Sequence, residues 1–450
     1  MEDRGRSTEV EPGVDGENRA DPNEFSGGYR RYVLGVLLFV YAINILDRQI
    51  LGILMEPIRL ELDLSDTQLG FLSGIAFALF YATLGIPIAR LADRTSRTGV
   101  ISISIAAWSA MTAVCGVAQS FWQLLAARVG VAVGEAGGSP PSHSLLADYF
   151  KEHERATALG IFAIGGPLGV MIGLFVGGWL NEWFGWRVTF LVVGLPGLLV
   201  ALLVWLTVRE PSKGSLDGQV GGAPQPSSSV AEVFRFLWTQ RAFRMMALGA
   251  ALQSFVGYGL LQWYPVFFIR IHELGTGELG TWLALVFGIG GGIGTFFGGY
   301  LADRLAGRSR RWYLWLPMIG TAMATPFYLG VFFAPTAAGA FLFLIIPALL
   351  ANCFLGPVFS TTQGLVPAHM RATAAAVLLF IVNIIGLGLG PQIVGVLSDL
   401  LRPTFGVDSL RYALFSVSLV TLAGAALFWT AARTLDADLD RAARYGKEGP

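Results

Sequence analysis

The sequence predicts an all-α membrane protein with twelve transmembrane helices arranged as two six-helix bundles. Three observations support this class. Of the 450 residues, 54% are hydrophobic and 14% charged, and the mean hydropathy is +0.60, whereas an ordinary soluble domain is about a quarter charged. The apolar residues form twelve long stretches, and a short motif recurs in both halves. Because so apolar a chain cannot cover a water-facing surface with polar groups, the bilayer is its expected solvent.

Each predicted span is long enough to cross a hydrocarbon core of ~30 Å, which takes about 20 helical residues. The breaks between spans contain turn-forming residues, such as Pro335 and the stretch 402–406. The expected spans cover residues 30–55, 66–90, 99–118, 121–149, 154–180, 187–208, 241–269, 278–302, 312–333, 337–366, 371–400 and 410–432.

The segments outside the spans differ in composition. Residues 1–28 are hydrophilic and acidic, which predicts a disordered tail. Residues 209–240 connect the N-terminal bundle (29–208) to the C-terminal bundle (241–432). Within this connection, EPSKGSLDGQVGGAPQPSSS is rich in Gly, Ser and Pro and predicts a flexible linker. Residues 433–450 form the expected C-terminal tail.

The distribution of Lys and Arg predicts the orientation in the membrane. If the N-terminus is cytoplasmic, five of the 31 basic residues lie outside, two lie within spans, and 24 remain inside. Both termini and the linker are therefore expected in the cytoplasm, and the protein is expected to be a multi-pass protein of the cell (inner) membrane. The five outside residues are Arg59, Arg187, Arg270, Arg402 and Arg411.

Composition argues against several other classes. The formal net charge is zero, so no basic field indicates nucleic acid. The two cysteines lie in apolar runs and the four histidines lack ligand spacing, so we expect neither a disulfide framework nor a metal site. The glycine-rich stretch 288–294 lies inside an apolar span with no strand before it, which argues against a nucleotide loop. No nucleophile–base pair or cofactor loop supports an enzyme.

An internal repeat relates the two halves. The sequence LADR occupies 91–94 and recurs 210 residues later at 301–304. Each copy follows an even-numbered span, at an expected cytoplasmic helix end. These copies resemble the Gly-x-x-x-Asp-Arg-x-Gly-Arg signature of the major facilitator superfamily. They depart from it at Ala89 and Ser96, and by one extra residue before Gly307. The resemblance covers about residues 29–432 and implies a transporter built from two repeated bundles.

Within that superfamily the chain resembles the spinster group. The resemblance is carried by NILDR at 44–48, RVGVAVGEA at 128–136 and SHSLLADYF at 142–150. It implies export of lysolipids and sphingosine-1-phosphate-like lipids.

Four charged residues lie well inside spans, all in the N-terminal half: Asp47, Arg48, Arg128 and Glu135. A charge near the bilayer midplane is costly unless it is paired or hydrated, and such residues usually mark a transport pathway. Arg128 and Glu135 share a helix face, seven residues apart. Asp47 is expected to meet one of them, because the resemblance implies that these two helices line a central cavity. We expect Asp47 and Glu135 to carry protons, and Arg48 and Arg128 to bind an anionic headgroup. A static ion-pair network that only fixes helix packing is the alternative.

Asp93, Arg94, Arg97, Asp303 and Arg304 lie at the repeated helix ends. A carboxylate there can cap a helix of the other half, and the resemblance implies that such contacts close the cytoplasmic side. For the arginines, the positive-inside bias alone is an equally good explanation.

The C-terminal half offers neutral polar groups among many aromatic residues. A cavity with a charged wall on the N-terminal side and a neutral, aromatic wall on the C-terminal side suits an amphiphile, whose tail would lie against the C-terminal half. The expected cavity residues are Gln253, Gln262, Tyr264, Asn352, Thr361, Gln363 and Asn383.

The sequence thus predicts a proton-linked secondary transporter that exports an anionic or zwitterionic lysolipid-like amphiphile by alternating access. Its expected partners are this amphiphile, protons and membrane lipids, without a cofactor, and the protein is expected to be a monomer. A porter of drugs, sugars or organic acids is the alternative with the same fold. A receptor that binds without transporting is the alternative from another class.

Overall fold

A computed structural model describes residues 25–211 and 229–448, and every regular element in these ranges is helical. Most of the predicted N-terminal tail and linker, and the last two residues, lie outside them. The helices of the N-terminal half are α1 (Gly27–Leu62), α2 (Asp66–Ser73), α3 (Ile75–Arg94), α4 (Arg97–Cys115), α5 (Phe121–Glu135), α6 (Ser139–Tyr149), α7 (Glu152–Ala163) and α8 (Gly165–Thr207).

The C-terminal half repeats this pattern of long and interrupted helices. Two helices contain π-helical turns, at 284–289 and 383–389. The helices of this half are α9 (Val230–Thr239), α10 (Arg241–His272), α11 (Thr276–Leu283), α12 (Gly290–Ala306), α13 (Trp312–Phe333), α14 (Ala337–Leu350), α15 (Leu355–Gly364), α16 (Arg371–Val382), α17 (Gly390–Phe405), α18 (Ser409–Ser418) and α19 (Val420–Glu448).

Local sequence explains where several helices begin and break. Ser65 and Gln68 form a capping box at the start of α2, and Ser96 and Ser120 accept backbone N–H groups at the starts of α4 and α5. Such caps stabilise a helix by ~0.5–2 kcal/mol. Gly185 interrupts α8 with a φ of 78°, a conformation that glycine adopts without steric penalty. The chain reverses there, between the predicted spans 154–180 and 187–208.

Eight helical segments in the described residues are long and apolar enough to cross a membrane. Two of these are much longer than one crossing needs: 153–207 has 55 residues and 371–445 has 75. Twelve crossings therefore stay a prediction. The segment assigned to the linker contains α9 at its C-terminal end, and α19 continues through the predicted C-terminal tail to Glu448.

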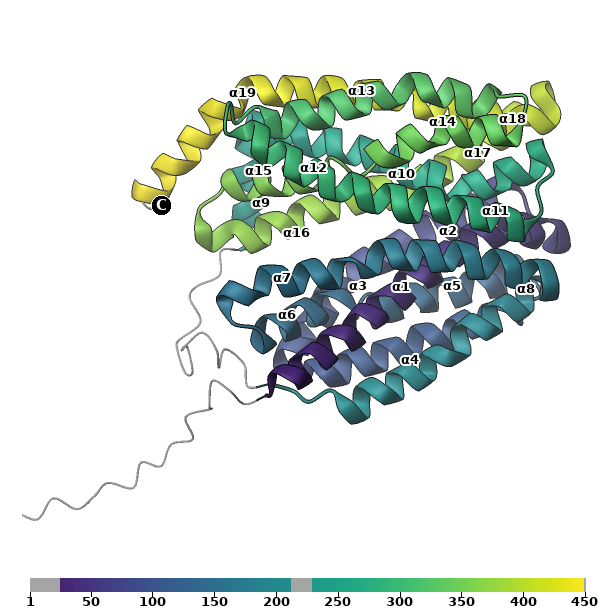
Figure 1. Ribbon diagram of the computed structural model, residues 1–450, viewed down its shortest axis with the longest axis horizontal. Helices are drawn as coiled ribbons and strands as arrows, with labels where there is room; N and C mark the ends of the chain where they lie inside the picture. The colour runs from purple at the N-terminus through teal and green to yellow at the C-terminus, as the bar shows by residue number, and fades with distance from the viewer. Residues whose placement is uncertain (1–24, 212–228, 449–450) are drawn as a thin grey trace, which may run out of the picture.

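The two halves pack side by side and converge toward one end (Figure 1). We call this the far end; it contains the start of α2, the start of α11 and the end of α17. At the opposite end, which we call the linker end, the chain leaves α8 and re-enters at α9. Thr207 and Arg209 at this end bond to Tyr29 at the start of α1.

Candidate functional site

One buried ion pair joins α1 to α5 inside the N-terminal half. Nε of Arg48 donates to Oε2 of Glu135 at 2.5 Å. Glu135 is 1% exposed. The guanidinium of Arg48 also lies over the ring of Tyr81 on α3, 4.3 Å from its centroid. The pair brings together two of the four charged residues that the sequence predicts for the cavity.

Arg128 lies beside this pair but forms no ion pair among the described residues. Its guanidinium lies over the ring of Phe77, 5.3 Å from the centroid, and that of Arg48 lies 5.2 Å from the same centroid. Arg128 is 2% exposed, and its Nε and Nη1 have no hydrogen-bond partner in the part of the chain described here. Because buried donors are rarely left unpaired, this guanidinium is suited to receive an anion.

Asp47 faces a third helix. Its Oδ2 accepts the hydroxyl of Thr112 on α4 at 3.3 Å, and its buried Oδ1 has no partner within the described ranges. Successive helical residues point about 100° apart, so when Arg48 faces α5 its neighbour is turned away. In this structure Asp47 therefore bonds to neither Arg128 nor Glu135, the two partners that the sequence suggests.

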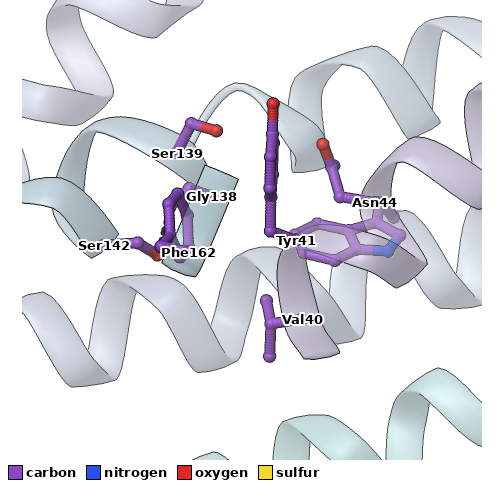
Figure 2. Close-up of a pocket in the computed structure, with 8 residues that line it drawn as sticks. Val40, Tyr41, Asn44, Gly138, Ser139, Ser142 and Phe162 are labelled. Carbon is purple, nitrogen blue, oxygen red and sulfur yellow. Dashed lines mark hydrogen bonds between the residues drawn. The ribbon is translucent and has the colours of Figure 1, made fainter. Parts of the chain in front are cut away.

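A small pocket lies next to this charge cluster, one helical turn before Arg48. Its cavity volume is about 10 Å³, which is room for about one water molecule. Figure 2 shows Tyr41 and Asn44 projecting from α1 across from Phe162 and Ser142. The other lining residues are Val40, Trp108, Gly138 and Ser139.

The aromatic residues of α3 and the hydroxyl of Thr112 are site residues that the sequence does not reveal. Phe77 and Tyr81 are four residues apart and therefore share a face of α3. In an apolar span that is rich in aromatic residues, this spacing carries no distinctive signal. Their role becomes visible when two guanidiniums lie over them.

The expected cavity residues of the C-terminal half occupy varied positions. Gln253, Gln262, Tyr264 and Thr361 are buried, Asn352 and Asn383 are half-buried, and Gln363 is exposed. Oε1 of both Gln253 and Gln262 is buried without a partner in the described residues. Tyr264 stacks among aromatic rings, with its centroid 5.6 Å from that of Phe287 and 6.1 Å from that of Phe332. This half presents neutral polar and aromatic groups.

At the linker end, two of the predicted gate residues, Asp303 and Arg304, bond within their own half. Asp303 accepts the hydroxyl of Tyr313, and Arg304 donates to Tyr300. Arg94 is exposed. The side chain of Asp93 lies outside the described part of the structure.

Arg97 is buried and fixes the beginning of the linker. It pairs with Asp148 and, at 2.6 Å, with Glu210. Partial burial favours a higher pKa for Glu210, but the N–H of Thr98 and the guanidinium of Arg97 outweigh it, so the pKa lies below the ordinary value. Glu210 is therefore held as a carboxylate.

At the far end, each half caps a helix of the other. Asp399 on α17 accepts the N–H groups of Asp66 and Thr67 at the start of α2, at 3.2 and 2.7 Å. Glu182 on α8 accepts the N–H of Gly277 at 2.8 Å and the hydroxyl of Thr276 at 3.3 Å, at the start of α11. The residues capped in α11 lie 210 residues after those capped in α2, the same offset as the LADR repeat. We call these two contacts the far-end caps.

Arg270 on α10 adds an ionic contact between the halves at the same end. It donates to both carboxylate oxygens of Asp66, at 2.7 and 2.8 Å, and to Glu56 on α1. Both acids are buried, 1% and 4% exposed. Across the described residues, hydrogen bonds between the halves lie at the far end, and none joins them at the linker end.

Relatives of known description share most of this chain. An "MFS-type efflux pump" of Mycolicibacterium smegmatis is 34% identical over 412 residues, which is 91% of this chain and 94% of that protein. Human "Protein spinster homolog 1" is 27% identical over 441 residues, 93% of this chain and 83% of that protein.

Solved structures agree with these sequence relationships. A bacterial homologue of the human lysosomal transporter spinster, in an inward-facing and unoccupied conformation, matches with a TM-score of 0.85 and 34% identity over 92% of this chain and 99% of that one. Its occupied inward-facing form matches with a TM-score of 0.81. The family model of the Major Facilitator Superfamily matches residues 37–391. This chain therefore belongs to the Major Facilitator Superfamily of membrane transporters, and within it resembles the spinster proteins.

Proposed function

We propose that this transporter carries out proton-coupled export of an anionic or zwitterionic lysolipid-like amphiphile by alternating access. The observation that carries the proposal is the buried guanidinium of Arg128, whose Nε and Nη1 lack partners among the described residues. A phosphate presents oxygens that match the planar fork of arginine. Binding the headgroup there removes the unfavourable free energy of the unpaired donors.

Proton exchange follows from the pairing of Arg48 with Glu135. A proton on Glu135 removes the charge that holds Arg48, because a neutral carboxyl binds a guanidinium far more weakly than a carboxylate does. Arg48 is then available to bind the headgroup together with Arg128, since both already lie over Phe77. Headgroup release allows Glu135 to lose its proton and to recover Arg48. Proton and substrate are thereby linked through one arginine.

The contrast between the two halves supports an amphiphilic substrate. The stretch 312–370 contains no Asp, Glu, Lys or Arg. Tyr264 packs among aromatic rings in the C-terminal half, which makes this half apolar next to the charged N-terminal half. We propose that the headgroup binds to the N-terminal half and the tail lies against the C-terminal half, near the expected polar residues.

We propose twelve crossings, a cytoplasmic linker end and a location in the cell membrane. The basic residues support this orientation, because the five predicted for the outside include Arg270 and Arg187, and both bond to far-end acids. The far-end caps then close the outside, which agrees with the inward-facing conformation of the matched spinster homologue. In the opposite state, Asp93, Arg94, Arg97, Asp303 and Arg304 would close the cytoplasmic side.

The test is flux of a labelled lysolipid in proteoliposomes, with and without an imposed pH gradient. Wild type is expected to transport faster with the gradient. Glu135→Gln is expected to fold and to lose this dependence, and Arg128→Ala is expected to abolish flux of a phosphate-bearing substrate. Glu61→Gln is the matched control, because Glu61 pairs with Arg187 within the N-terminal half, away from the charge cluster.

Two results would overturn the proposal. Unchanged pH dependence in Glu135→Gln would exclude the proton role, and full flux in Arg128→Ala would exclude the headgroup role. A drug-like cargo is the second candidate, favoured by the name of the Mycolicibacterium relative, an efflux pump. Competition between the labelled lysolipid and a panel of drugs, sugars and organic acids distinguishes the cargoes. Saturable binding without flux would indicate a receptor.

A further inference from the structure

The helix α9 has an apolar arc wider than its contact with the protein. Val233 and Leu237 are buried in the C-terminal half, and Phe236 is half-buried with its ring 4.7 Å from that of Tyr445. These residues hold the helix against α16, α10 and the end of α19. A helix of only ten residues is marginal in isolation, so this packing stabilises it.

A second apolar stripe on α9 faces away from the protein. Val230, Phe234 and Trp238 are spaced four residues apart and are 55%, 41% and 40% exposed. The rings of Phe234 and Trp238 stack at 5.1 Å with an interplanar angle of 18°. Two stacked aromatic rings in contact with water would be unfavourable, so this stripe indicates a contact with something apolar.

The polar residues of α9 lie on the remaining side. Glu232, Arg235 and Thr239 are all exposed, and at 100° per residue they fall within an arc of about 60°. The helix therefore has three sides: one on the protein, one apolar and exposed, and one polar. This arrangement is typical of a helix in the plane of a membrane–water interface.

The position of α9 supports the same environment. It starts the C-terminal half at the linker end (Figure 1), where Tyr32, Trp205 and Tyr300 are also exposed, by 40%, 58% and 49%. Exposed Trp and Tyr gather at the two interfaces of a membrane protein. Trp238 belongs to the group at the linker end. The exposed stripe thus continues the lipid-facing surface of the bundle.

We propose that α9 is an interfacial helix, with Val230, Phe234 and Trp238 inserted at the headgroup–acyl boundary of the leaflet on the linker side. Its occupant is the lipid bilayer surface. Arg235 faces the water and phosphate layer, where its cation is solvated. The helix thereby fixes the height at which the linker enters the C-terminal half, because α10 follows directly at Arg241.

The test uses nitroxide labels on the full-length protein in nanodiscs of phosphatidylcholine and phosphatidylglycerol. One label replaces Phe234 (Phe234→Cys) and the matched control replaces Arg235 (Arg235→Cys), both with Cys353→Ser. Power saturation compares collisions with oxygen, which enters lipid, and with a water-soluble nickel chelate. Phe234→Cys is expected to give an oxygen-to-nickel ratio at least fivefold above that of Arg235→Cys.

Two outcomes would overturn this proposal. Equal ratios at both positions would place the stripe in water. Shielding of the Phe234 label from both reagents would show that protein covers it, either residues 212–228 or a second copy of the chain. A label at Trp238 (Trp238→Cys) repeats the measurement if the first variant fails to fold. Lysolipid flux is not part of the readout, so failure here is independent of the proposed substrate.

Discussion

The far-end caps are expected to hold the two halves together, and Asp399→Asn tests this directly. Asparagine keeps the shape of the side chain but loses its charge, and its NH2 nitrogen, unlike the carboxylate oxygen that it replaces, cannot accept a hydrogen bond. An anion at a helix N-terminus stabilises by ~0.3–1 kcal/mol, and up to ~2 kcal/mol when partly buried. One of the two N–H groups that donate to Asp399 then loses its acceptor, which destabilises the closed far end by about 1 kcal/mol.

Together these effects amount to about 1.5–3 kcal/mol in favour of opening the far end. Since about 1.4 kcal/mol changes an equilibrium tenfold, the ratio of far-end-open to far-end-closed molecules should rise by roughly 10- to 100-fold. Glu182→Gln removes the corresponding charge from the cap on α11 and should act in the same direction. The two caps lie on different helix pairs, so their effects should be nearly additive in the double variant.

Pulsed electron–electron double resonance measures this opening as a distance between two spin labels. Leu60 in the N-terminal half and Val407 in the C-terminal half are far-end positions, 67% and 68% exposed, where labels disturb little packing. A longer distance should be a minor population in the parent protein and should grow in Asp399→Asn. Glu278→Gln is the control, because Glu278 is an exposed acid on α11 whose carboxylate bonds to no residue of the other half within the described ranges.

The reasoning is refuted if Asp399→Asn leaves the distance distribution unchanged while the protein stays folded. It is also refuted if Glu278→Gln opens the far end as much as Asp399→Asn does. In that case the general loss of negative charge at this end, and not the capped helix, would control the equilibrium.

Three further changes have defined outcomes. Gly280→Leu should also lengthen the far-end distance, because a Cβ at Gly280 would lie 3.2 Å from the Cα of Gly178 across the interface. Gly299→Leu is the control and should leave this distance unchanged, because a Cβ at Gly299 would meet open space. Arg128→Lys keeps the charge without the bidentate fork, so the KM for a phosphate-bearing lysolipid should rise by about 10- to 100-fold in a flux assay; an unchanged KM would contradict the headgroup role. Because the pKa of Glu210 is lowered in the folded protein, its carboxylate stabilises the fold at pH values above the ordinary carboxyl pKa of 4.5. This stabilisation is lost as the pH falls through the pKa that Glu210 has in the folded protein. The melting temperature of Glu210→Gln should therefore lie below that of wild type at pH 7 and approach it at low pH, and a constant difference would contradict this.

The sequence predicts the positions of the helices well, because apolar length is set directly by the bilayer. The predicted span 312–333 coincides with α13, and 241–269 lies within α10 (Arg241–His272). It does not predict α9, because ten residues are too few for a span and the neighbouring Gly/Ser/Pro-rich stretch suggests a linker throughout. The amphipathic period of α9 is present in the sequence, but a search for crossings passes over it.

The pairing inside the charge cluster could not be predicted from the sequence. Asp47 and Arg48 are adjacent, so the rotation of α1 decides which of them faces α5. That rotation is set by glycines of α8: a Cβ at Gly173 would lie 3.1 Å from the Cα of Leu46, and one at Gly169 would lie 2.7 Å from the Cβ of Ile45. Close packing on one side of α1 therefore directs Arg48 to Glu135, and no local rule contains this information.

The two halves contribute differently to the proposed cycle. The far-end caps occur in both halves at the same repeat offset, and each uses backbone N–H groups, which neither gain nor lose a proton. The four charged residues of the candidate site, in contrast, belong to the N-terminal half alone. Closure can therefore be symmetric while proton and headgroup chemistry stays on one side. Since the buried Arg48–Glu135 ion pair lies at the proposed headgroup site, whereas the far-end caps lie away from it, we infer that pH acts on the cycle mainly through Arg48 and its partner Glu135. The two sets of variants should then separate: changes at the caps should shift the resting conformation, and Glu135→Gln should alter its response to pH.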